Sequence, residues 1–266
     1  MVDPATPLGP LRDHARRDTR LRKAGARGRS TPIVLVHGAW HGAWCWSRVR
    51  AALSAGGVER VLTPTLTGLG ERSAELDRTV GLGTHVGDVV DLIDRVGEPL
   101  VLVGHSYAGL VVREAADRRP DAVAHLVLVD AWTGADGDSL LARAPAWMAD
   151  HLTGAAAAQG DGWRIPPPDP ALVGVDDPLD AALLRAHLTD QPLASFTEPT
   201  RLSGAADRVP TSAVIAEPSL LPFRQWADEA GWPTTAVPAG HDLMLTAPVP
   251  LARSLASVAF SRAAGR

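Results

Sequence analysis

Several features that would point to particular protein classes are scarce in this sequence. A single cysteine, Cys45, is present among 266 residues, which excludes an internal disulfide framework and a metal site made of several thiolates. The 26 Lys and Arg residues are outnumbered by 30 Asp and Glu residues, so the chain lacks the basic excess that is typical of nucleic-acid binding. No apolar run approaches the ~20 residues of a membrane span, and no secretory signal is recognisable. We therefore expect a cytoplasmic protein with no nucleic-acid or membrane partner.

The sequence divides into regions of different pattern. Residues 1–30 are rich in arginine and have no apolar stretch, so we expect a flexible basic extension. Residues 31–130 and 209–266 alternate short apolar runs with amphipathic segments, which predicts alternating strands and helices. Because these runs are continuously apolar, we expect an α/β fold with a mostly parallel sheet covered by helices on both faces. Residues 131–208 contain helix-like segments and a proline-rich loop without alternating strands, which predicts a helical cap over the strand ends.

Individual elements can be placed from the same periodicities. Strands are expected at residues 31–38, 58–63, 100–103, 125–130, 211–216 and 234–239. Helices are expected at residues 47–55, 81–97, 108–119, 222–230 and 249–260, and in the cap at residues 178–188. In the helix at residues 81–97, Thr84 is the expected N-terminal cap and Gly97 the expected stop.

The motif GHSYAG, residues 104–109, lies between the strand at residues 100–103 and the helix that follows it. A serine in a tight strand–turn–helix connection is typical of a nucleophile elbow. The neighbours two residues away must be small, because the turn is strained and crowded. Gly104 meets this requirement, and Ala108 stands where glycine is usual. Ser106 also lies at a helix N-terminus, where backbone N–H groups favour developing negative charge, so the pattern indicates a nucleophile rather than a simple helix cap.

A nucleophilic serine requires a base and an acid that orients the base. His241 follows the last predicted strand in the loop PAGHDLMLTAP, which predicts a position near the elbow at the carboxyl end of the sheet. The acid usually follows the strand at residues 211–216, where Glu217 is the only carboxylate. Asp130 ends the strand after the elbow, a costly place for an unpaired carboxylate, and is the preferred acid, with Glu217 as the alternative. Asp242 is adjacent to the histidine and badly placed to orient its ring.

Acyl transfer also requires hydrogen-bond donors for the oxygen on which negative charge develops. The backbone N–H of Tyr107, directly after the serine, is one expected donor. The other is expected from the first loop, where Gly38 precedes Ala39 and lets the N–H of Ala39 face the site. With these donors, Ser106 is expected to attack an ester carbonyl while His241 takes the serine proton.

Three segments, VLVHGAWHGAWCW, GHSYAG and GHDLMLTAP, occur in this order and resemble the α/β-hydrolase superfamily. More narrowly, they are similar to the branch of plant methyl esterases and hydroxynitrile lyases with their bacterial esterase relatives, over about residues 31–260. The resemblance implies the α/β-hydrolase fold, with Ser106 and His241 as nucleophile and base and with Ala39 and Tyr107 as oxyanion donors. The family's usual position for the acid is not matched here.

Two positions bear on whether the chain resembles the esterases or the lyases of this branch. Lyases tend to have threonine after the histidine of the first loop and lysine after the base, whereas this chain has Gly38 and Asp242. The resemblance therefore implies hydrolysis of a carboxylic ester through an acyl-enzyme, with no metal or organic cofactor. The alternatives are a lyase, cyclase or C–C hydrolase on the same scaffold, and a catalytically slow ligand-binding homologue.

The expected substrate is a small hydrophobic or aromatic ester, because the first loop and the cap are rich in tryptophan and other apolar residues. The expected substrate contacts are Gly38, Trp40 and His41 on the first loop and Trp132, Trp147, Trp163 and Phe196 on the cap. We expect a monomer or a homodimer.

Overall fold

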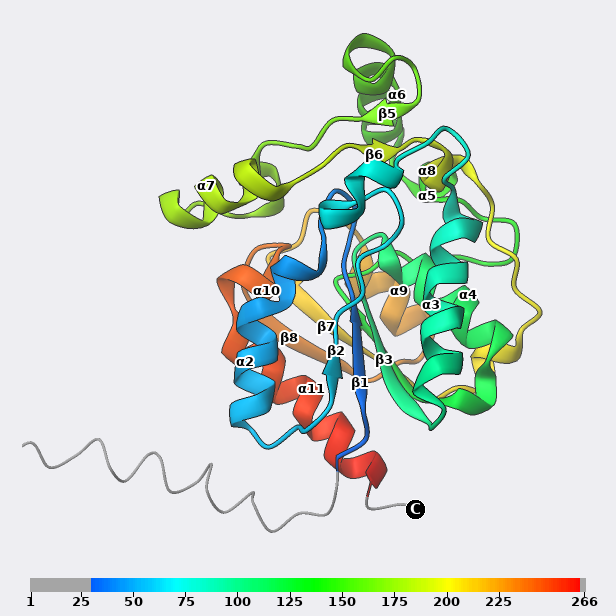
Figure 1. The fold of residues 1–266 in the computed structure, drawn as a ribbon, viewed down its shortest axis with the longest axis vertical. Coiled ribbons are helices and arrows are strands. Elements are labelled where there is room, and N and C mark those ends of the chain that lie inside the picture. Colours follow the sequence, from blue (N-terminus) through cyan, green and yellow to red (C-terminus); the bar gives the residue numbers. More distant parts are fainter. Residues whose placement is uncertain (1–29, 264–266) are drawn as a thin grey trace, which may run out of the picture.

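The computed structural model describes residues 30–263 and contains a six-stranded sheet (Figure 1). The predicted basic extension, apart from residue 30, lies outside the described residues. The strand order is β2-β1-β3-β4-β7-β8, and every neighbouring pair is parallel. The strands are β1 (Ile33–Val36), β2 (Val61–Leu62), β3 (Leu100–His105), β4 (Val123–Val129), β7 (Thr211–Glu217) and β8 (Thr234–Pro238). The expected α/β fold with a mostly parallel sheet is confirmed.

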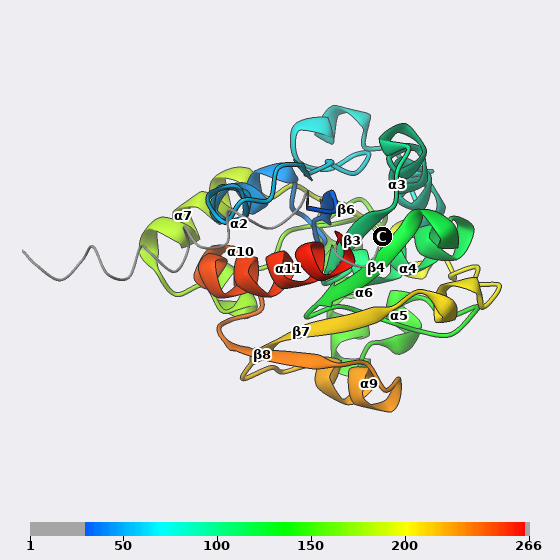
Figure 2. The ribbon, with the colours of Figure 1, turned by 90° about the horizontal axis from the view of Figure 1, so that it is seen from below.

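Helices cover both faces of this sheet (Figure 2). They are α2 (Ser47–Ala55), α3 (Leu82–Val96), α4 (Ala108–Arg118), α9 (Phe223–Glu229), α10 (Leu243–Thr246) and α11 (Pro248–Ala263). Val34 and Val36 of β1 join an apolar cluster with α3, α4 and α9. Ile33 and Leu35 point the other way and join a cluster with α2 and α11. A strand that is buried on both faces has no polar side, which explains the uninterrupted apolar runs in the sequence.

The segment between β4 and β7 consists of helices joined by long loops. Its helices are α5 (Leu140–Arg143), α6 (Ala146–Gln159), α7 (Pro178–His187) and α8 (Ala194–Thr197). It also contains an antiparallel pair, β5 (Arg164–Ile165) and β6 (Gln191–Pro192), which the sequence did not predict. Strands of two residues show no alternation by which they could be recognised. In Figure 1, α6, α7, β5 and β6 lie above the carboxyl ends of the main strands.

Two local expectations differ from the structure. The strand expected at residues 58–63 is only Val61–Leu62, because β2 is an edge strand that pairs with β1 over two residues. Thr84 is not the N-cap of α3: the N-cap is Gly81, whose N–H donates to the Thr84 hydroxyl at 3.3 Å. The expected end of this helix is confirmed, since Gly97 has the left-handed φ of +69° that favours glycine.

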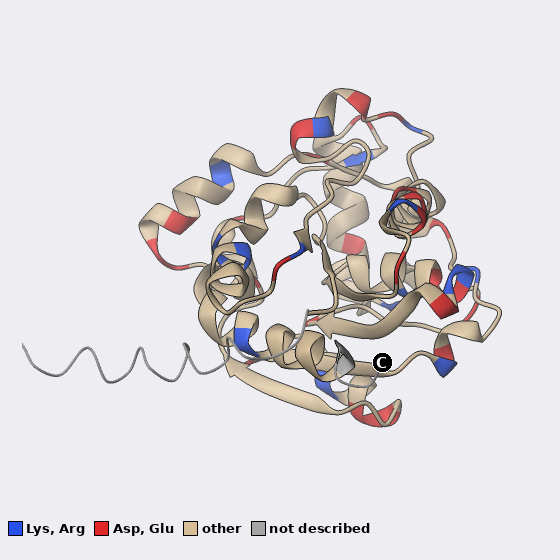
Figure 3. Cartoon of the chain, turned by 60° about the horizontal axis from the view of Figure 1, so that its bottom comes forward, with Lys and Arg blue, Asp and Glu red and all other residues tan. Residues whose placement is uncertain are grey.

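Basic and acidic residues are interspersed around the molecule (Figure 3). Many form ion pairs at the surface, such as Arg119 with Asp94 and Arg60 with Glu98. Exposed pairs of this kind contribute only about 0–1 kcal/mol each, so the fold depends mainly on the two apolar clusters. Within residues 30–263, no helix is long and apolar enough to cross a membrane.

Close packing at the start of α4 depends on Gly109. A Cβ atom there would lie 2.2 Å from the Trp132 carbonyl oxygen, which is backbone and cannot rotate away. We expect Gly109→Ala to lower the free energy of unfolding by about 3 kcal/mol, the upper end for overpacking. As a matched control, Gly154→Ala in α6 meets no atom within 4 Å and should raise stability slightly through helix propensity. Thermal unfolding measures both, and equal melting temperatures for Gly109→Ala and wild type would contradict this packing.

Candidate active site

Ser106 occupies the sharp turn between β3 and α4. Its φ is +53°, a left-handed conformation that costs a non-glycine residue about 1–3 kcal/mol. The turn is held from both sides, because the Ser106 N–H donates to the Val129 carbonyl and the Ser106 carbonyl accepts from the Trp132 N–H. Gly104 has no room for a side chain, since a Cβ atom would lie 2.5 Å from Val112 Cγ2. The surrounding structure therefore imposes the conformation that exposes the serine at the carboxyl end of β3.

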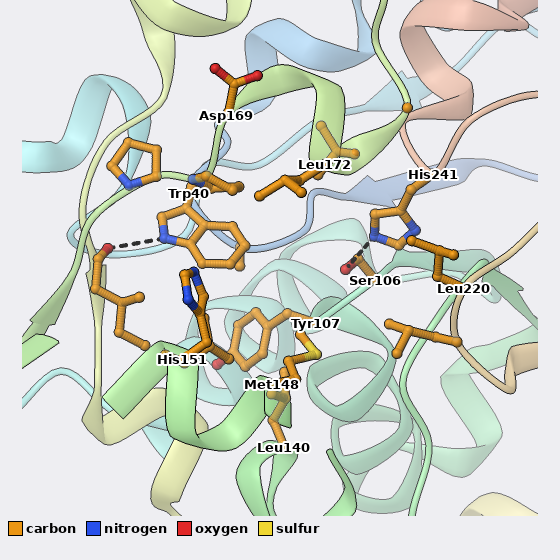
Figure 4. Close-up of a pocket in the computed structure, with 18 of the residues that line it drawn as sticks. Trp40, Ser106, Tyr107, Leu140, Met148, His151, Asp169, Leu172, Leu220 and His241 are labelled. Atoms are coloured by element: carbon orange, nitrogen blue, oxygen red, sulfur yellow. Dashed lines mark hydrogen bonds between the residues drawn. The ribbon is translucent and has the colours of Figure 1, made fainter. Parts of the chain in front are cut away.

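A continuous series of hydrogen bonds connects Ser106, His241 and Asp130. Ser106 Oγ lies 2.9 Å from His241 Nε2, as drawn in Figure 4, and His241 Nδ1 lies 2.6 Å from Asp130 Oδ2. The other carboxylate oxygen of Asp130 accepts from the Ala216 N–H at 3.1 Å. Asp130 is only 1% exposed, so its carboxylate is directed by these contacts and not by water. Geometrically, this is the arrangement of a serine, a base and an orienting acid.

The electrostatics at His241 favour the protonated ring more than ordinary solvent does. Burial acts to lower the pKa of His241, but the hydrogen bond and charge of Asp130, aided by the charge of Asp242, outweigh it and raise that pKa above the ordinary 6.5. These contacts therefore favour an imidazolium at His241, 2.9 Å from Ser106 Oγ.

The alternative acid, Glu217, does not reach His241. Its carboxylate accepts two hydrogen bonds from the Arg224 guanidinium, and its side chain is 48% exposed. Asp242 is also directed elsewhere, because its carboxylate binds His41 at 3.1 Å. Of the three carboxylates considered from the sequence, only Asp130 lies within hydrogen-bond distance of the His241 ring.

Both expected oxyanion donors lie beside Ser106. Ala39 and Tyr107 line the same cavity as the serine, and neither backbone N–H has a hydrogen-bond acceptor among residues 30–263. Gly38 permits this approach of the first loop to the elbow, since a Cβ atom there would lie 2.8 Å from His105 Nδ1 and 3.0 Å from Ser106 Cβ. Two N–H groups without an acceptor among residues 30–263 thus belong to residues that line the cavity together with Ser106.

The cavity above Ser106 has a volume of about 510 Å³ and a mainly apolar lining. Trp40 forms one wall, and its indole N–H donates to the Ile165 carbonyl at 3.0 Å (Figure 4). Its backbone N–H donates to Gln191 Oε1 at 2.9 Å, so the residue is held from two sides. Phe196 packs against the ring edge of Trp40 with centroids 5.8 Å apart. The loop after β1, through Trp40, and the segment between β4 and β7, through Phe196, therefore form one continuous aromatic surface.

The expected substrate contacts are only partly on this cavity. Trp40, Trp132, Trp147 and Phe196 line it. Gly38, His41 and Trp163 do not: Gly38 lies tightly against His105 and Ser106, His41 is buried against Asp242, and Trp163 packs under the guanidinium groups of Arg78 and Arg164. Lining residues missed from the sequence include Leu140, Met148, His151, Leu172, Leu220 and Phe223. The missed residues on α6 could have been indicated by the apolar pattern of that helix. The missed residues on loops have no periodic pattern by which they could be found.

Within residues 30–263, no group of three or more His, Cys, Asp or Glu residues is placed to hold a metal ion.

A parallel sheet that presents a serine on a strained turn, with an aspartate and a histidine just after two later strands, defines a hydrolase of the α/β class. The family model described as "Alpha/beta hydrolase family" matches residues 33–254. The chain belongs to this family.

Relatives and solved structures agree with that assignment. A carbendazim hydrolyzing esterase of Nocardioides sp. (strain SG-4G) is 38% identical over 243 residues, which is 85% of this chain and 98% of that protein. The rice esterase PIR7B (Oryza sativa subsp. japonica) is 43% identical over 102 residues, 37% of this chain and 38% of that protein. An extracellular alpha/beta-hydrolase from a Paenibacillus species superposes with a TM-score of 0.77 at 22% identity, covering 86% of this chain and 99% of that one. The pyrethroid hydrolase PytH gives a TM-score of 0.69 at 23% identity, covering 88% and 98%.

Proposed function

We propose that this protein is a serine esterase that cleaves carboxylic esters of small hydrophobic or aromatic molecules. The observation that carries the proposal is the hydrogen-bonded series Ser106–His241–Asp130 on the wall of an apolar cavity. The esterase relative that matches 85% of this chain adds independent support.

The reaction would proceed in two halves. In the first, His241 Nε2 takes the hydroxyl proton as Ser106 Oγ attacks the ester carbonyl carbon, and the N–H groups of Ala39 and Tyr107 donate to the oxyanion. The tetrahedral intermediate collapses, His241 returns the proton to the departing alcohol, and an acyl-Ser106 ester remains. In the second half, His241 activates a water that attacks this ester, which releases the carboxylic acid and restores the serine. Throughout, Asp130 orients the imidazole and stabilises its protonated form.

The substrate class follows from the cavity. A volume of about 510 Å³ suits a small molecule, and the aromatic surface of Trp40, Phe196 and Trp132 favours a flat apolar group. We propose that residues 131–208 act as a cap, because α6 and the proline-rich loop contribute much of the cavity lining opposite Ser106. The carbendazim and pyrethroid enzymes named above are relatives with hydrolytic activity on organic molecules, which is consistent with this class.

Two observations favour hydrolysis over lyase chemistry or ligand binding. At position 38, where lyases of this branch tend to have threonine, a β-carbon would lie only 3.0 Å from Ser106 Cβ. At position 242, where they tend to have lysine, Asp242 is fully buried away from the cavity. Neither lyase-type side chain therefore has a counterpart here. The binding-protein alternative depended on a missing acid, and Asp130 lies 2.6 Å from His241.

The proposal is tested by hydrolysis of p-nitrophenyl acetate, p-nitrophenyl butyrate and methyl esters of aromatic acids. We expect Ser106-dependent turnover of these esters and none of cyanohydrins. Turnover of cyanohydrins without ester hydrolysis would instead support the lyase alternative.

The rate of ester hydrolysis should depend on pH through His241. The base acts only when its ring is neutral, so kcat/KM should fall as the pH decreases through its pKa. Because the hydrogen bond and charge of Asp130 outweigh burial and raise that pKa, the inflection should lie above the ordinary 6.5. A profile of kcat/KM between about pH 5 and 9 on a neutral ester measures it. An inflection below 6.5, with the protein still folded, would contradict the account.

A further inference from the structure

A buried polar cluster lies next to His241, outside the cavity lining. It consists of His41, His105 and Asp242, which are 3%, 1% and 0% exposed. Each member comes from a different part of the site. His41 is in the loop that carries Ala39, His105 immediately precedes Ser106, and Asp242 immediately follows His241. The ester-hydrolysis steps above use none of the three side chains.

The contacts of His41 determine its protonation. Its Nδ1 lies 2.7 Å from the Ala39 carbonyl oxygen, and its Nε2 lies 3.1 Å from Asp242 Oδ2. When Asp242 is ionised both partners are acceptors, so both ring nitrogens donate and the ring is an imidazolium paired with a carboxylate. Burial acts to lower the pKa of His41, but the charge and hydrogen bond of Asp242 and the Ala39 carbonyl outweigh it and raise that pKa. Correspondingly, burial acts to raise the pKa of Asp242, and His41 with the neighbouring histidines lowers it overall.

His105 adds a third connection. Its Nε2 donates to the His241 carbonyl at 3.0 Å and lies 4.0 Å from Asp242 Oδ1. Burial lowers the pKa of His105 well below its ordinary value, so its ring is neutral. Buried side chains thus connect three loops: the elbow through His105, the loop after β1 through His41, and the loop that carries His241 through Asp242.

From this geometry we infer that Asp242 and His41 are positioning residues for ester hydrolysis, whose ion pair holds the loop of the base against the loop of the oxyanion donor. The inference rests on the proposed esterase function. A buried ion pair is costly to desolvate, and well-packed apolar residues often serve stability as well or better, so stability alone does not account for it. Ala39, whose carbonyl accepts the hydrogen bond from His41, is also the residue whose N–H is proposed to donate to the oxyanion, so a shift of His41 reaches that donor through a single residue.

The test is Asp242→Asn, which keeps the shape of the side chain and removes its charge. We expect kcat to fall by about 10-fold to 100-fold with little change in KM, because misplacement by about 1 Å costs catalysis of this order. The acid limb of the kcat/KM profile should move to lower pH, because the charge of Asp242 is one of the factors that raise the pKa of His241. The other titratable groups facing the pair are His37, His105 and Cys45. The charge of Asp242 acts to raise the pKa of His105 and of Cys45, but burial is the larger cause for each, so in the variant His105 stays neutral and Cys45 stays a thiol.

Asp117→Asn is the matched control. Asp117 is 7% exposed, accepts hydrogen bonds from the Ser203 and Ala206 N–H groups, and lies about 13 Å along α4 from its start. This control should lose stability but keep the kcat and pH profile of wild type. If Asp242→Asn behaves like Asp117→Asn, with a lower melting temperature only, the positioning role is wrong. His41→Gln and the double variant complete a cycle, in which one shared function predicts that the losses do not multiply.

A measurement on the wild-type protein keeps the test independent of turnover. NMR titration of labelled histidine rings should show His41 mostly doubly protonated at pH 6.5, and the pKa of His241 lower in Asp242→Asn than in wild type. A neutral His41 at that pH, or an unchanged His241, would overturn the inference even if no ester is hydrolysed. Absent turnover by wild type with the expected titrations would instead count against the proposed esterase function alone.

Discussion

Ser106→Ala is expected to reduce kcat for p-nitrophenyl butyrate hydrolysis by about 10³-fold to 10⁶-fold, to a rate near the background. Removal of the nucleophile of such a site leaves only binding and oxyanion stabilisation, which accelerate the reaction far less. Alanine also fits the turn as serine does, so the fold should be retained. Steady-state kinetics with circular dichroism as a check on folding make the measurement.

The chain offers a matched control for this substitution. Ser212 on β7 lies 2.9 Å from His125 Nε2, the same distance as that between Ser106 and His241. Ser212→Ala therefore removes a serine in an equivalent contact, away from the cavity, and activity should stay within about twofold of wild type. Substantial esterase activity in folded Ser106→Ala would show that another group is the nucleophile.

Asp130→Asn should have the second largest effect, a fall in kcat of about 10⁴-fold. The asparagine amide can present its NH₂ to His241 Nδ1, which stabilises the tautomer with the proton on Nε2 and so prevents that nitrogen from taking the serine proton. It also removes the hydrogen bond and charge that raise the pKa of His241.

Glu217→Gln is the comparison for this variant. Glu217 contacts Arg224 at the surface, so the change should leave kcat within about twofold and alter stability by less than about 1 kcal/mol. If activity were instead lost in Glu217→Gln and kept in Asp130→Asn, the loop that carries His241 would have to adopt a conformation different from the one in this structure.

Much of the fold was predictable because its signals are local. The apolar strands β1, β3 and β4 are long enough to be recognised, and Gly97 ends α3 through its own left-handed backbone. The elbow could be found from the sequence because the turn leaves no space for a side chain at position 104. Only glycine meets this requirement, so the constraint is visible as Gly104 in the motif. By contrast, β2, β5 and β6 have two residues each and depend on their partners rather than on a periodic pattern.

The choice between Asp130 and Glu217 could be narrowed from the sequence but not decided. Both follow or end neighbouring strands, β4 and β7, and both lie at the carboxyl end of the sheet. Tertiary contacts separate them: Arg224, the second residue of α9, binds the Glu217 carboxylate at the surface, and the Ala216 N–H donates to the Asp130 carboxylate.

Sequence reasoning was weakest for the cavity lining. Trp40 faces the cavity and its backbone N–H is bound by Gln191, far along the chain, whereas Trp163 lies against Arg78, also distant in sequence, and against the adjacent Arg164. Both are tryptophans near proline or glycine, and no local pattern distinguishes them. Such long-range contacts determine substrate contacts, so residues such as Leu172 and Leu220 were found only in the structure.

The central claim is that Ser106 is a nucleophile activated by His241 and Asp130, and stoichiometric reaction with diethyl p-nitrophenyl phosphate tests it most directly. Attack by Ser106 Oγ forms an O–P bond and expels p-nitrophenolate, and the diethylphosphoryl ester cannot be released as readily as an acyl group. The account predicts one p-nitrophenolate per chain, a matching mass increase on the peptide that contains Ser106, and no release from Ser106→Ala. Absence of an adduct in folded wild-type protein, or an adduct on another residue, would contradict it.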